Sequence, residues 1–346
     1  MKLNKILVAI LIVFSLLMIG LIIADANMQK TTSDRYCLGT YCRITVYGKK
    51  AKAEKAIQSV WQEITELENA ISVNLPYSEI SIVNDNAGNG QFQQVSEQTY
   101  NLVKSGLELC NETEGALNIA LGKVIEAWAI GTDKARVPSF EETDSLLKYC
   151  DLSFIQYQEK DGKFYLMVQN EGCAINLGAI GKGWATNIAR NILRDNGIKN
   201  AIIDFGGNIC VVGSMPKLIG SRAYKIGLQD PLSTRGEFFT TINVRDLSVV
   251  TSGSYERYLE AEDGHRYSHI IDPSTGRSIE NNVKSVSIIG PDSFICDALS
   301  TALFVIGPNK ANIFMTEKFS QYCAIFLIDN NGIDEVVRVG NIGILE

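Results

Sequence analysis

The segment NLGAIGKG, residues 176–183, joins a mostly apolar stretch to a helical pattern. The preceding residues 173–177 fit a short strand. After the segment, apolar residues recur at helical spacing over residues 182–196, and Gly197 fits the C-terminal cap of that helix. Three glycines within eight residues favour a tight connection. The sequence therefore predicts a strand, a glycine-rich turn and a helix in direct succession.

The segments on either side mix strand and helix patterns without the regular order of a doubly wound sheet. Turn-forming residues predict a loop over residues 72–95. No internal repeat and no long linker after residue 35 divides the chain, so we expect one α+β domain of mixed sheets and helices. The predicted helices cover 53–71, 97–109, 124–128, 141–150, 182–196 and 293–305, and the predicted strands lie within 35–48, 164–168, 173–177, 201–205, 223–228, 238–244, 283–289 and 322–328.

The N-terminus has the pattern of an export signal. Lys2 and Lys5 precede an unbroken apolar run of 18 residues, 6–23, which is just long enough to span a bilayer. Residues 24–26 fit a small-x-small cleavage site, so a cleaved signal peptide and a retained membrane anchor both remain open. We expect residues 1–26 to be this signal or anchor, 27–35 a tether, and 36–346 a catalytic domain exported to the outer face of the cytoplasmic membrane.

Composition excludes several classes of protein. The formal charge is −7, and no cluster of Lys and Arg interleaves with aromatic residues, so we expect no nucleic-acid partner. The eight cysteines are scattered without a CxxC pair, and the two histidines cannot form a multi-histidine metal site. Most cysteines are expected to be buried as small apolar residues, while a disulfide between Cys37 and Cys42 across a hairpin stays open.

Three segments carry candidate chemistry. The first is residues 176–183, because glycines let a ligand approach the backbone and a helix N-terminus favours anions such as phosphate or pyrophosphate. A purely structural strand-to-helix turn is the alternative there.

The second segment covers 251–258 and 267–276. Hydroxyl groups gather there around His269, a candidate for proton transfer, and Asp272 lies in a turn.

The third segment is residues 292–303. Asp297 and Thr301 are four residues apart, so they share one face of a helix that is otherwise apolar. A buried carboxylate needs a partner, and a carboxylate with a hydroxyl offers the hard oxygen ligands that suit Mg²⁺. An aspartate in the first turn of a helix, or one in a salt bridge, remains the alternative.

These segments occur in the order found in the ApbE family of FAD:protein FMN transferases, which the chain resembles over about residues 36–310. The resemblance also rests on Gly39-Thr40, on residues 78–80 with Asn84, and on residues 114–116 with 128–131. It implies Mg²⁺-dependent transfer of FMN from FAD, through a phosphoester bond, to a Thr or Ser of a target protein. It also implies export, and an acceptor among the flavin-carrying subunits of membrane redox complexes.

The resemblance implies a set of site residues as well. The metal is expected at the Ala179 backbone carbonyl, the Asp297 carboxylate and the Thr301 hydroxyl. His269 is our candidate base for the acceptor hydroxyl, with Asp272 orienting it or sharing the role. The Gly206-Gly207 turn is expected against the same pocket. Contacts to FAD are expected at Leu38, Ala116, Leu117, Asn118, Asn176, Lys182 and Ile271.

Three asparagines depart from the family pattern. Asn118 and Asn176 stand where the family has aspartate, and Asn74 stands where an aromatic residue commonly packs on the flavin. Losing that stacking removes about 1 kcal/mol of binding free energy. We therefore expect weaker retention of FAD. Hydrolysis of FAD to FMN and AMP is one alternative function, and a non-catalytic exported FAD-binding protein is another.

Overall fold

The computed structural model describes residues 10–16, 18, 20, 29–217, 219–231, 233–234, 236–255 and 257–345. Most of the predicted signal or anchor, residues 1–26, and the start of the predicted tether lie outside the described residues. In the part of the chain that the structure describes, no helix has the length and apolar content needed to cross a bilayer.

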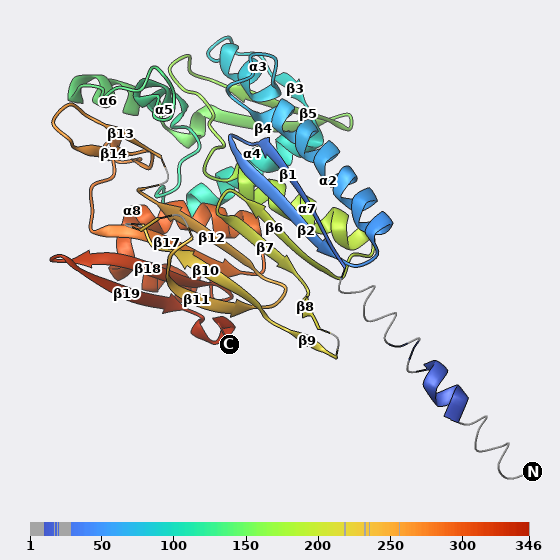
Figure 1. The fold of residues 1–346 in the computed structure, drawn as a ribbon. Coiled ribbons are helices and arrows are strands. Elements are labelled where there is room, and N and C mark those ends of the chain that lie inside the picture. The colour runs from blue at the N-terminus through green and yellow to red at the C-terminus, as the bar shows by residue number, and fades with distance from the viewer. Residues whose placement is uncertain are drawn as a thin grey trace, which may run out of the picture.

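An eight-stranded antiparallel sheet forms the centre of the domain (Figure 1). Residues far apart in sequence therefore lie side by side, since β2 pairs with β6 and β12 lies between β7 and β17. The predicted α+β architecture is confirmed. In sheet order, the strands are β1 (Lys30–Cys37), β2 (Thr40–Tyr47), β6 (Asn200–Phe205), β7 (Asn208–Val212), β12 (Ser248–Gly253), β17 (Val283–Gly290), β18 (Cys323–Asn330) and β19 (Ile333–Gly340).

Three helices pack on one face of this sheet: α2 (Lys50–Ile71), α7 (Gly181–Asp195) and α8 (Ser293–Glu317). Their apolar faces join the sheet in one continuous core. The predicted helix 293–305 corresponds to the first half of α8. Gly307 has a non-helical backbone (φ 74°, ψ 170°) and Pro308 follows it, so the helix is interrupted there before it continues.

The other face of the sheet is covered in part by the hairpin of β10 (Tyr224–Gln229) and β11 (Phe238–Val244). A second apolar cluster lies between this hairpin and the sheet. Strands β17 and β18 are therefore buried on both faces, which explains the nearly continuous apolar sequence of β18.

A smaller unit lies beyond one end of the large sheet (Figure 1). It contains a three-stranded sheet in the order β3-β5-β4 and four helices. The elements are α3 (Glu79–Asp85), β3 (Gln93–Val95), α4 (Glu97–Glu112), α5 (Gly122–Trp128), α6 (Phe140–Leu147), η1 (Leu152–Phe154), β4 (Ile155–Lys160) and β5 (Lys163–Val168). Short pieces complete the fold: β8 (Met215–Pro216), β9 (Ser221–Arg222), β13 (Tyr258–Glu260), β14 (Arg266–Ser268), β15 (Ile271–Asp272), β16 (Arg277–Ser278) and η2 (Ile342–Leu345).

Three expectations from the sequence need correction or an answer here. The predicted strand 173–177 is wrong, because in this stretch only Ala174 pairs, in an isolated bridge with Leu121. The predicted loop 72–95 is wrong in part, because it contains α3 and β3. Ser78 caps α3 by accepting a hydrogen bond from the Ser81 N–H (3.0 Å), and Ile80 and Val83 are buried. Cys37 and Cys42 are free thiols, and the Cys42 thiol donates to the Cys37 carbonyl (3.5 Å).

Helices α7 and α8 cross in close contact at Gly183. A Cβ on this residue would stand 2.4 Å from the Ser293 carbonyl oxygen and 2.7 Å from the Asp297 Cβ. Both contacts involve atoms on or next to the backbone of α8, which cannot turn aside as a flexible side chain would. The crossing therefore requires glycine at position 183.

We predict that Gly183→Ala lowers the free energy of unfolding by about 1–3 kcal/mol, because α8 must shift to admit the methyl group. Gly181→Ala is the matched control, since its Cβ would meet only the end of the Ile71 side chain at 3.4 Å. Urea denaturation of both variants tests this, and an equal effect of the two changes would contradict it.

Candidate active site

Several turns meet at one end of the large sheet. The β1–β2 turn at 38–39 lies beside the β6–β7 turn at 206–207, because β2 pairs with β6. A Cβ on Gly206 would stand 2.2 Å from the Thr40 Oγ1, and Gly206 has φ 62°, so glycine is required. The Arg257 guanidinium donates to the carbonyl of the β1–β2 turn, which brings the segment before β13 to the same place.

Asp297 is the buried carboxylate of this site, with 2% of its surface exposed. Its Oδ2 accepts a hydrogen bond from the Gly183 N–H (2.7 Å), and its Oδ1 lies 3.6 Å from the Lys182 Nζ. Ile180, at the N-cap of α7, has no polar side chain, so Asp297 caps α7 from the neighbouring helix. Burial raises the pKa of Asp297, while Lys182 and the Gly183 N–H oppose that rise.

The Ala179 carbonyl is also available. Ala179 precedes Ile180, the N-cap of α7, and the Trp184 N–H bonds to the Ile180 carbonyl. The Gly183 N–H bonds to Asp297, and no described residue donates to the Ala179 carbonyl. Thr301 lies one turn after Asp297 on α8 and is half-buried. One carboxylate, one carbonyl and one hydroxyl are the hard oxygen donors that Mg²⁺ accepts, so the residues present fit this ion.

Asn208 completes the surroundings of Asp297. It is fully buried, and its Oδ1 accepts a hydrogen bond from the Ser293 hydroxyl (2.6 Å). Its amide lies close enough to Asp297 to lower the pKa of that carboxyl. The Nδ2 nevertheless has no partner at hydrogen-bonding distance in the described part of the chain, so it can donate to a bound phosphate oxygen.

The predicted base, His269, is held in one tautomer. Its Nδ1 lies 3.0 Å from the Arg257 carbonyl oxygen, which also accepts the His269 backbone N–H (3.1 Å). Because a carbonyl oxygen can only accept, we assign the proton to Nδ1 and the lone pair to Nε2. Burial lowers the pKa of His269 to about 4, and the nearby charges of Lys182 and Arg257 act in the same direction. The imidazole is therefore neutral at neutral pH.

Asp272, the predicted partner of His269, makes hydrogen bonds within its own turn. The Asp272 Oδ1 accepts the Ser274 N–H (2.8 Å) and the Ser274 hydroxyl (2.7 Å), so this carboxylate closes a turn. The Arg257 carbonyl bonds to the His269 Nδ1, and the role of Asp272 in orienting His269 or sharing its role stays a prediction. The effect of Lys182 on the pKa of His269 brings the histidine into one electrostatic environment with the Asp297 site.

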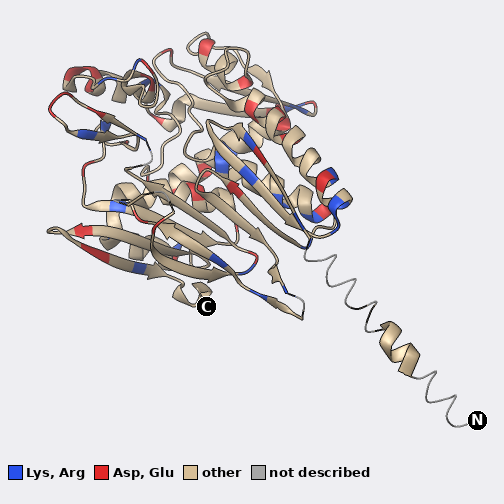
Figure 2. Ribbon diagram, viewed as in Figure 1, with Lys and Arg blue, Asp and Glu red and all other residues tan. Residues whose placement is uncertain are grey.

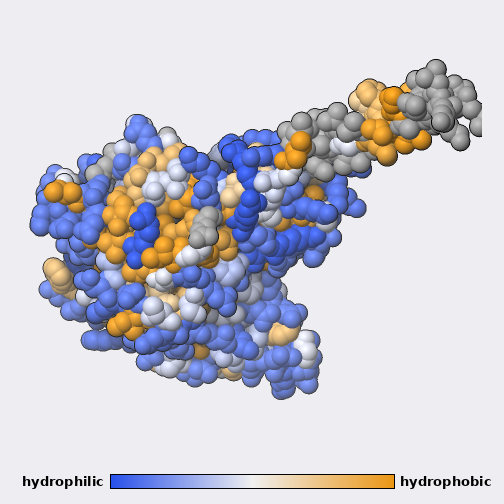
Figure 3. Space-filling view, turned by 90° about the horizontal axis from the view of Figure 1, so that it is seen from below, coloured by the Kyte–Doolittle hydropathy of each residue, from blue (hydrophilic) through white to orange (hydrophobic). Residues whose placement is uncertain are grey.

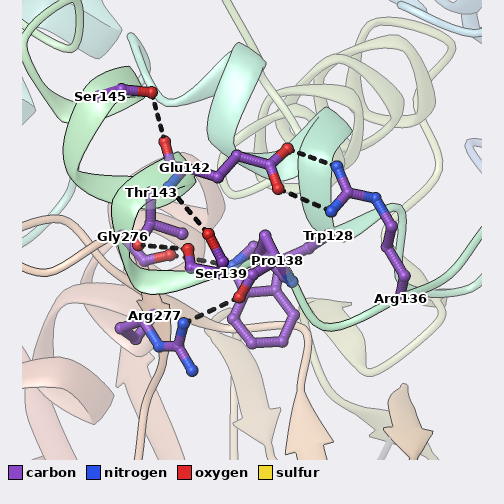
Figure 4. Close-up of polar contacts among 9 residues, drawn as sticks. All are labelled: Trp128, Arg136, Pro138, Ser139, Glu142, Thr143, Ser145, Gly276 and Arg277. Atoms are coloured by element: carbon purple, nitrogen blue, oxygen red, sulfur yellow. Dashed lines mark hydrogen bonds and ion pairs between the residues drawn. The ribbon is translucent and has the colours of Figure 1, made fainter.

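That turn is anchored on the smaller unit (Figure 4). The Trp128 indole N–H donates to the Gly276 carbonyl (2.9 Å), and Arg277 donates to the Pro138 carbonyl (3.0 Å). Ile271, one of the expected flavin contacts, is buried in the same apolar cluster as Trp128. These contacts fix the segment that carries His269 against α5 and α6.

The remaining flavin-side residues divide into three groups. Leu38 occupies the β1–β2 turn with φ 53°, and its N–H donates to the Glu68 Oε1 (2.7 Å). Leu117 is buried and Ala116 is half-buried, so both are packed against the core. Asn74 lies exposed in the turn after α2. The contacts of these residues with flavin stay predictions.

The two asparagines that replace family aspartates hold the backbone. The Asn176 Oδ1 accepts the Gly178 N–H (2.9 Å), a bond that a carboxylate can also make. The Asn118 Oδ1 accepts the Ala120 N–H (2.7 Å), and its Nδ2 donates to the Cys150 carbonyl (2.9 Å). A carboxylate has no N–H and cannot make the last bond, so the hydrogen bond to the Cys150 carbonyl explains why position 118 is asparagine.

Sequence reasoning missed Arg257, Glu68 and Asn208. Arg257 lies inside the hydroxyl-rich segment, but nothing in its spacing shows that it reaches the β1–β2 turn. Glu68 looks like an ordinary solvent-facing residue of a helix. Asn208 directly follows the Gly206-Gly207 turn, and its position next to this turn was the sequence feature that could have identified it as a site residue.

Known proteins resemble this chain over most of its length. The model of the ApbE family matches residues 38–326. An FAD:protein FMN transferase of Treponema pallidum is 33% identical over 91% of this chain and 90% of its own length. One of Klebsiella pneumoniae is 30% identical over 81% and 84%. The crystal structure of the ApbE protein of Thermotoga maritima is 29% identical, with a TM-score of 0.81 over 92% of this chain and 99% of that one.

The raised pKa of Asp297 predicts a pH-dependent stability. Ionisation costs more in the folded than in the unfolded protein, so the contribution of Asp297 falls as pH rises through its folded pKa. Asp297→Asn removes this cost and keeps an oxygen for the Gly183 N–H. We expect the melting temperature of the variant, relative to the wild type, to rise with pH in the presence of a chelator.

Asp246→Asn is a control with the opposite sign. Burial acts to raise the pKa of Asp246, but the Gly213 N–H and Arg194 outweigh it and lower that pKa. The Asp246 variant should therefore lose stability relative to the wild type as pH rises through the unfolded pKa. Parallel trends for the two variants would contradict the assignment of the Asp297 pKa.

Proposed function

The chain belongs to the ApbE family, and from this premise we propose that it transfers FMN from FAD to a Thr or Ser hydroxyl of a target protein and releases AMP. One observation carries this proposal. A buried carboxylate at the N-terminus of α7 shares its electrostatic environment with a lysine and with a neutral, oriented histidine. The lysine suits the negative charge of a pyrophosphate, the carboxylate suits a metal ion bound to it, and a hydroxyl nucleophile needs the histidine.

We propose that Mg²⁺ is held by the Ala179 carbonyl, the Asp297 carboxylate and the Thr301 hydroxyl. The described residues contain no group of three His, Cys, Asp or Glu placed to hold a metal, so the other ligands of such an ion would be substrate phosphates and water. When bound, the ion neutralises the pyrophosphate and stabilises the departing AMP.

The protein's own residues supply binding and one proton transfer. Lys182 and the N–H groups at the start of α7 bind the phosphates, and the Asn208 amide adds a buried donor. The acceptor hydroxyl gives its proton to the His269 Nε2 as its oxygen attacks the FMN phosphorus. A bond from that oxygen to phosphorus forms, and the bond from phosphorus to the AMP oxygen breaks.

Hydrolysis is the second candidate activity, with water in place of the acceptor hydroxyl. The exposed turn that carries Asn74 favours it, because an asparagine there offers no aromatic surface to the flavin. The two reactions share every group named above. They differ only in the nucleophile, so one assay with and without an acceptor protein measures both.

The proposal includes an exported location beside the membrane. In the described residues 10–16, six large apolar side chains, Ile10, Leu11, Ile12, Val13, Phe14 and Leu16, are each more than half exposed. This agrees with the apolar run and preceding lysines of an export signal or anchor. A flavin-carrying subunit of a membrane redox complex is the acceptor that such a location suits.

We predict that Asp297→Ala abolishes FMN transfer with Mg²⁺ present, and that Thr301→Val lowers it about tenfold or more. The readout is the FMN mass on a candidate acceptor, together with free FMN and AMP. Thr316→Val is the matched control, because Thr316 lies on the exposed second half of α8. Full activity of the Asp297 variant would remove the proposed metal site.

We predict that His269→Ala lowers the transfer rate by about 10²–10⁴-fold, the usual contribution of a general base. With a pKa of about 4, His269 is neutral above that pH, so its protonation should not reduce the rate between pH 8 and 6. The other histidine provides the control: His265→Ala should leave the rate nearly unchanged. Loss of wild-type activity around pH 6.5, absent from the His269 variant, would contradict the lowered pKa.

A further inference from the structure

The end of the large sheet opposite the site is where the described domain begins. The Gly48 N–H donates to the Gln29 carbonyl (2.9 Å), and Tyr47 lies opposite both Lys30 on β1 and Asn200 on β6. The turns of the site lie at the other ends of these same strands. Gln29, where the described domain begins, therefore lies at the end of the sheet away from the turns of the site.

Positive charge gathers at this end, although the whole chain has a formal charge of −7 (Figure 2). Contacts link its parts, since the Lys52 Nζ donates to the Gly197 carbonyl (2.9 Å) and Arg245 reaches the Ser221 hydroxyl (3.5 Å). Glu54, Asp195 and Asp246 are the acidic residues interspersed there. The basic end, as we define it, consists of Lys30, Lys49, Lys50, Lys52, Arg194, Lys199, Lys217, Arg222 and Arg245.

Most of these cations are free to attract another charge. Ion pairs in the described structure involve Lys50 with Glu54 and Arg194 with Asp246, and none involves the other members of the basic end. Three lysines, at positions 49, 50 and 52, also stand at the N-terminus of α2, where the helix dipole adds to their positive potential. The basic end is therefore complementary to an anionic surface.

An exposed isoleucine projects from the same end. Ile219 lies at the tip of the β8–β9 hairpin and is 89% exposed, more than any other large apolar residue in the described part of the chain. Lys217 and Arg222, both exposed, flank it. Seen from below, the underside carries strongly hydrophilic residues beside a broad apolar area (Figure 3). An apolar tip between cations matches the headgroup layer of an anionic bilayer.

We propose that the basic end is a membrane-contacting face, on which Ile219 enters the headgroup layer of an anionic bilayer while the surrounding lysines and arginines bind lipid phosphates. Three observations support it: the charge of the basic end, the exposed apolar tip, and the position of Gln29, where the described domain begins, at the same end. The active site then faces away from the membrane. None of this depends on flavin chemistry, so it can fail or succeed apart from the proposed function.

The test places an environment-sensitive fluorophore on the full chain through Ile219→Cys. Ile333→Cys is the matched control, because Ile333 is a 73% exposed residue at the tip of the β18–β19 hairpin. The eight native cysteines are buried and should label slowly. The protein is reconstituted in vesicles of phosphatidylcholine alone or mixed with phosphatidylglycerol. We expect blue-shifted emission and quenching by spin-labelled lipid at position 219, in the anionic vesicles only, and neither at 333.

A variant that lacks three positive charges tests whether attraction to anionic lipid holds position 219 at the membrane. Lys49→Gln, Lys217→Gln and Arg222→Gln together should shift the contact equilibrium about 100-fold toward the free form, about fivefold for each charge. Lys134→Gln, Lys148→Gln and Lys160→Gln, all exposed elsewhere, should leave it unchanged. Equal quenching at 219 and 333, or none at 219, would overturn the proposal. So would a shift at 219 without vesicles that grows with protein concentration, because it would assign the face to a second copy of the chain.

Discussion

The hydrogen bond between the Gly183 N–H and the Asp297 carboxylate is the contact on which the rest of the site depends. It joins α7 to α8 across 114 residues of sequence and requires that position 183 have no side chain. It also caps a helix that has no polar N-cap residue of its own. The Ala179 carbonyl, just before the N-cap of α7, has no donor among the described residues. One contact thus joins the two helices that carry the proposed metal ligands.

A second constraint is that the nucleophile's base must not be charged. His269 stands near Lys182 and Arg257, both positive, and burial adds to their effect on its pKa. The positive groups that we propose to bind the pyrophosphate therefore also keep the imidazole neutral and able to accept a proton. Its tautomer is set by a backbone carbonyl, which no side-chain substitution removes directly. In the proposed mechanism, the same charges thus serve anion binding and base chemistry.

The sequence predicts the local elements around the site and the spacing of its main residues. The glycine-rich turn before α7, and Asp297 with Thr301 on one helix face, follow from short-range periodicity and hold in the structure. Contacts between residues far apart in the chain are harder to predict from the sequence. Asn84 lies in the stretch predicted to be a loop, yet its side chain makes two hydrogen bonds to the backbone of Ile175, 91 residues away. Likewise, no pattern reveals that Arg257 reaches the β1–β2 turn, since that contact exists only after the sheet has formed.

The β1–β2 hairpin has a geometric consequence for how flavin would be delivered. Each strand has eight residues, and one end carries the turn with Leu38 while the other adjoins the departing N-terminal segment. At about 3.4 Å per residue, the hairpin holds the two ends about 27 Å apart. With the basic end on a bilayer, the length of the hairpin sets the height of the reactive phosphorus above the lipid. An acceptor anchored in the same membrane would then need its hydroxyl at a similar height, so strand length would select among possible acceptors before any side chain is recognised.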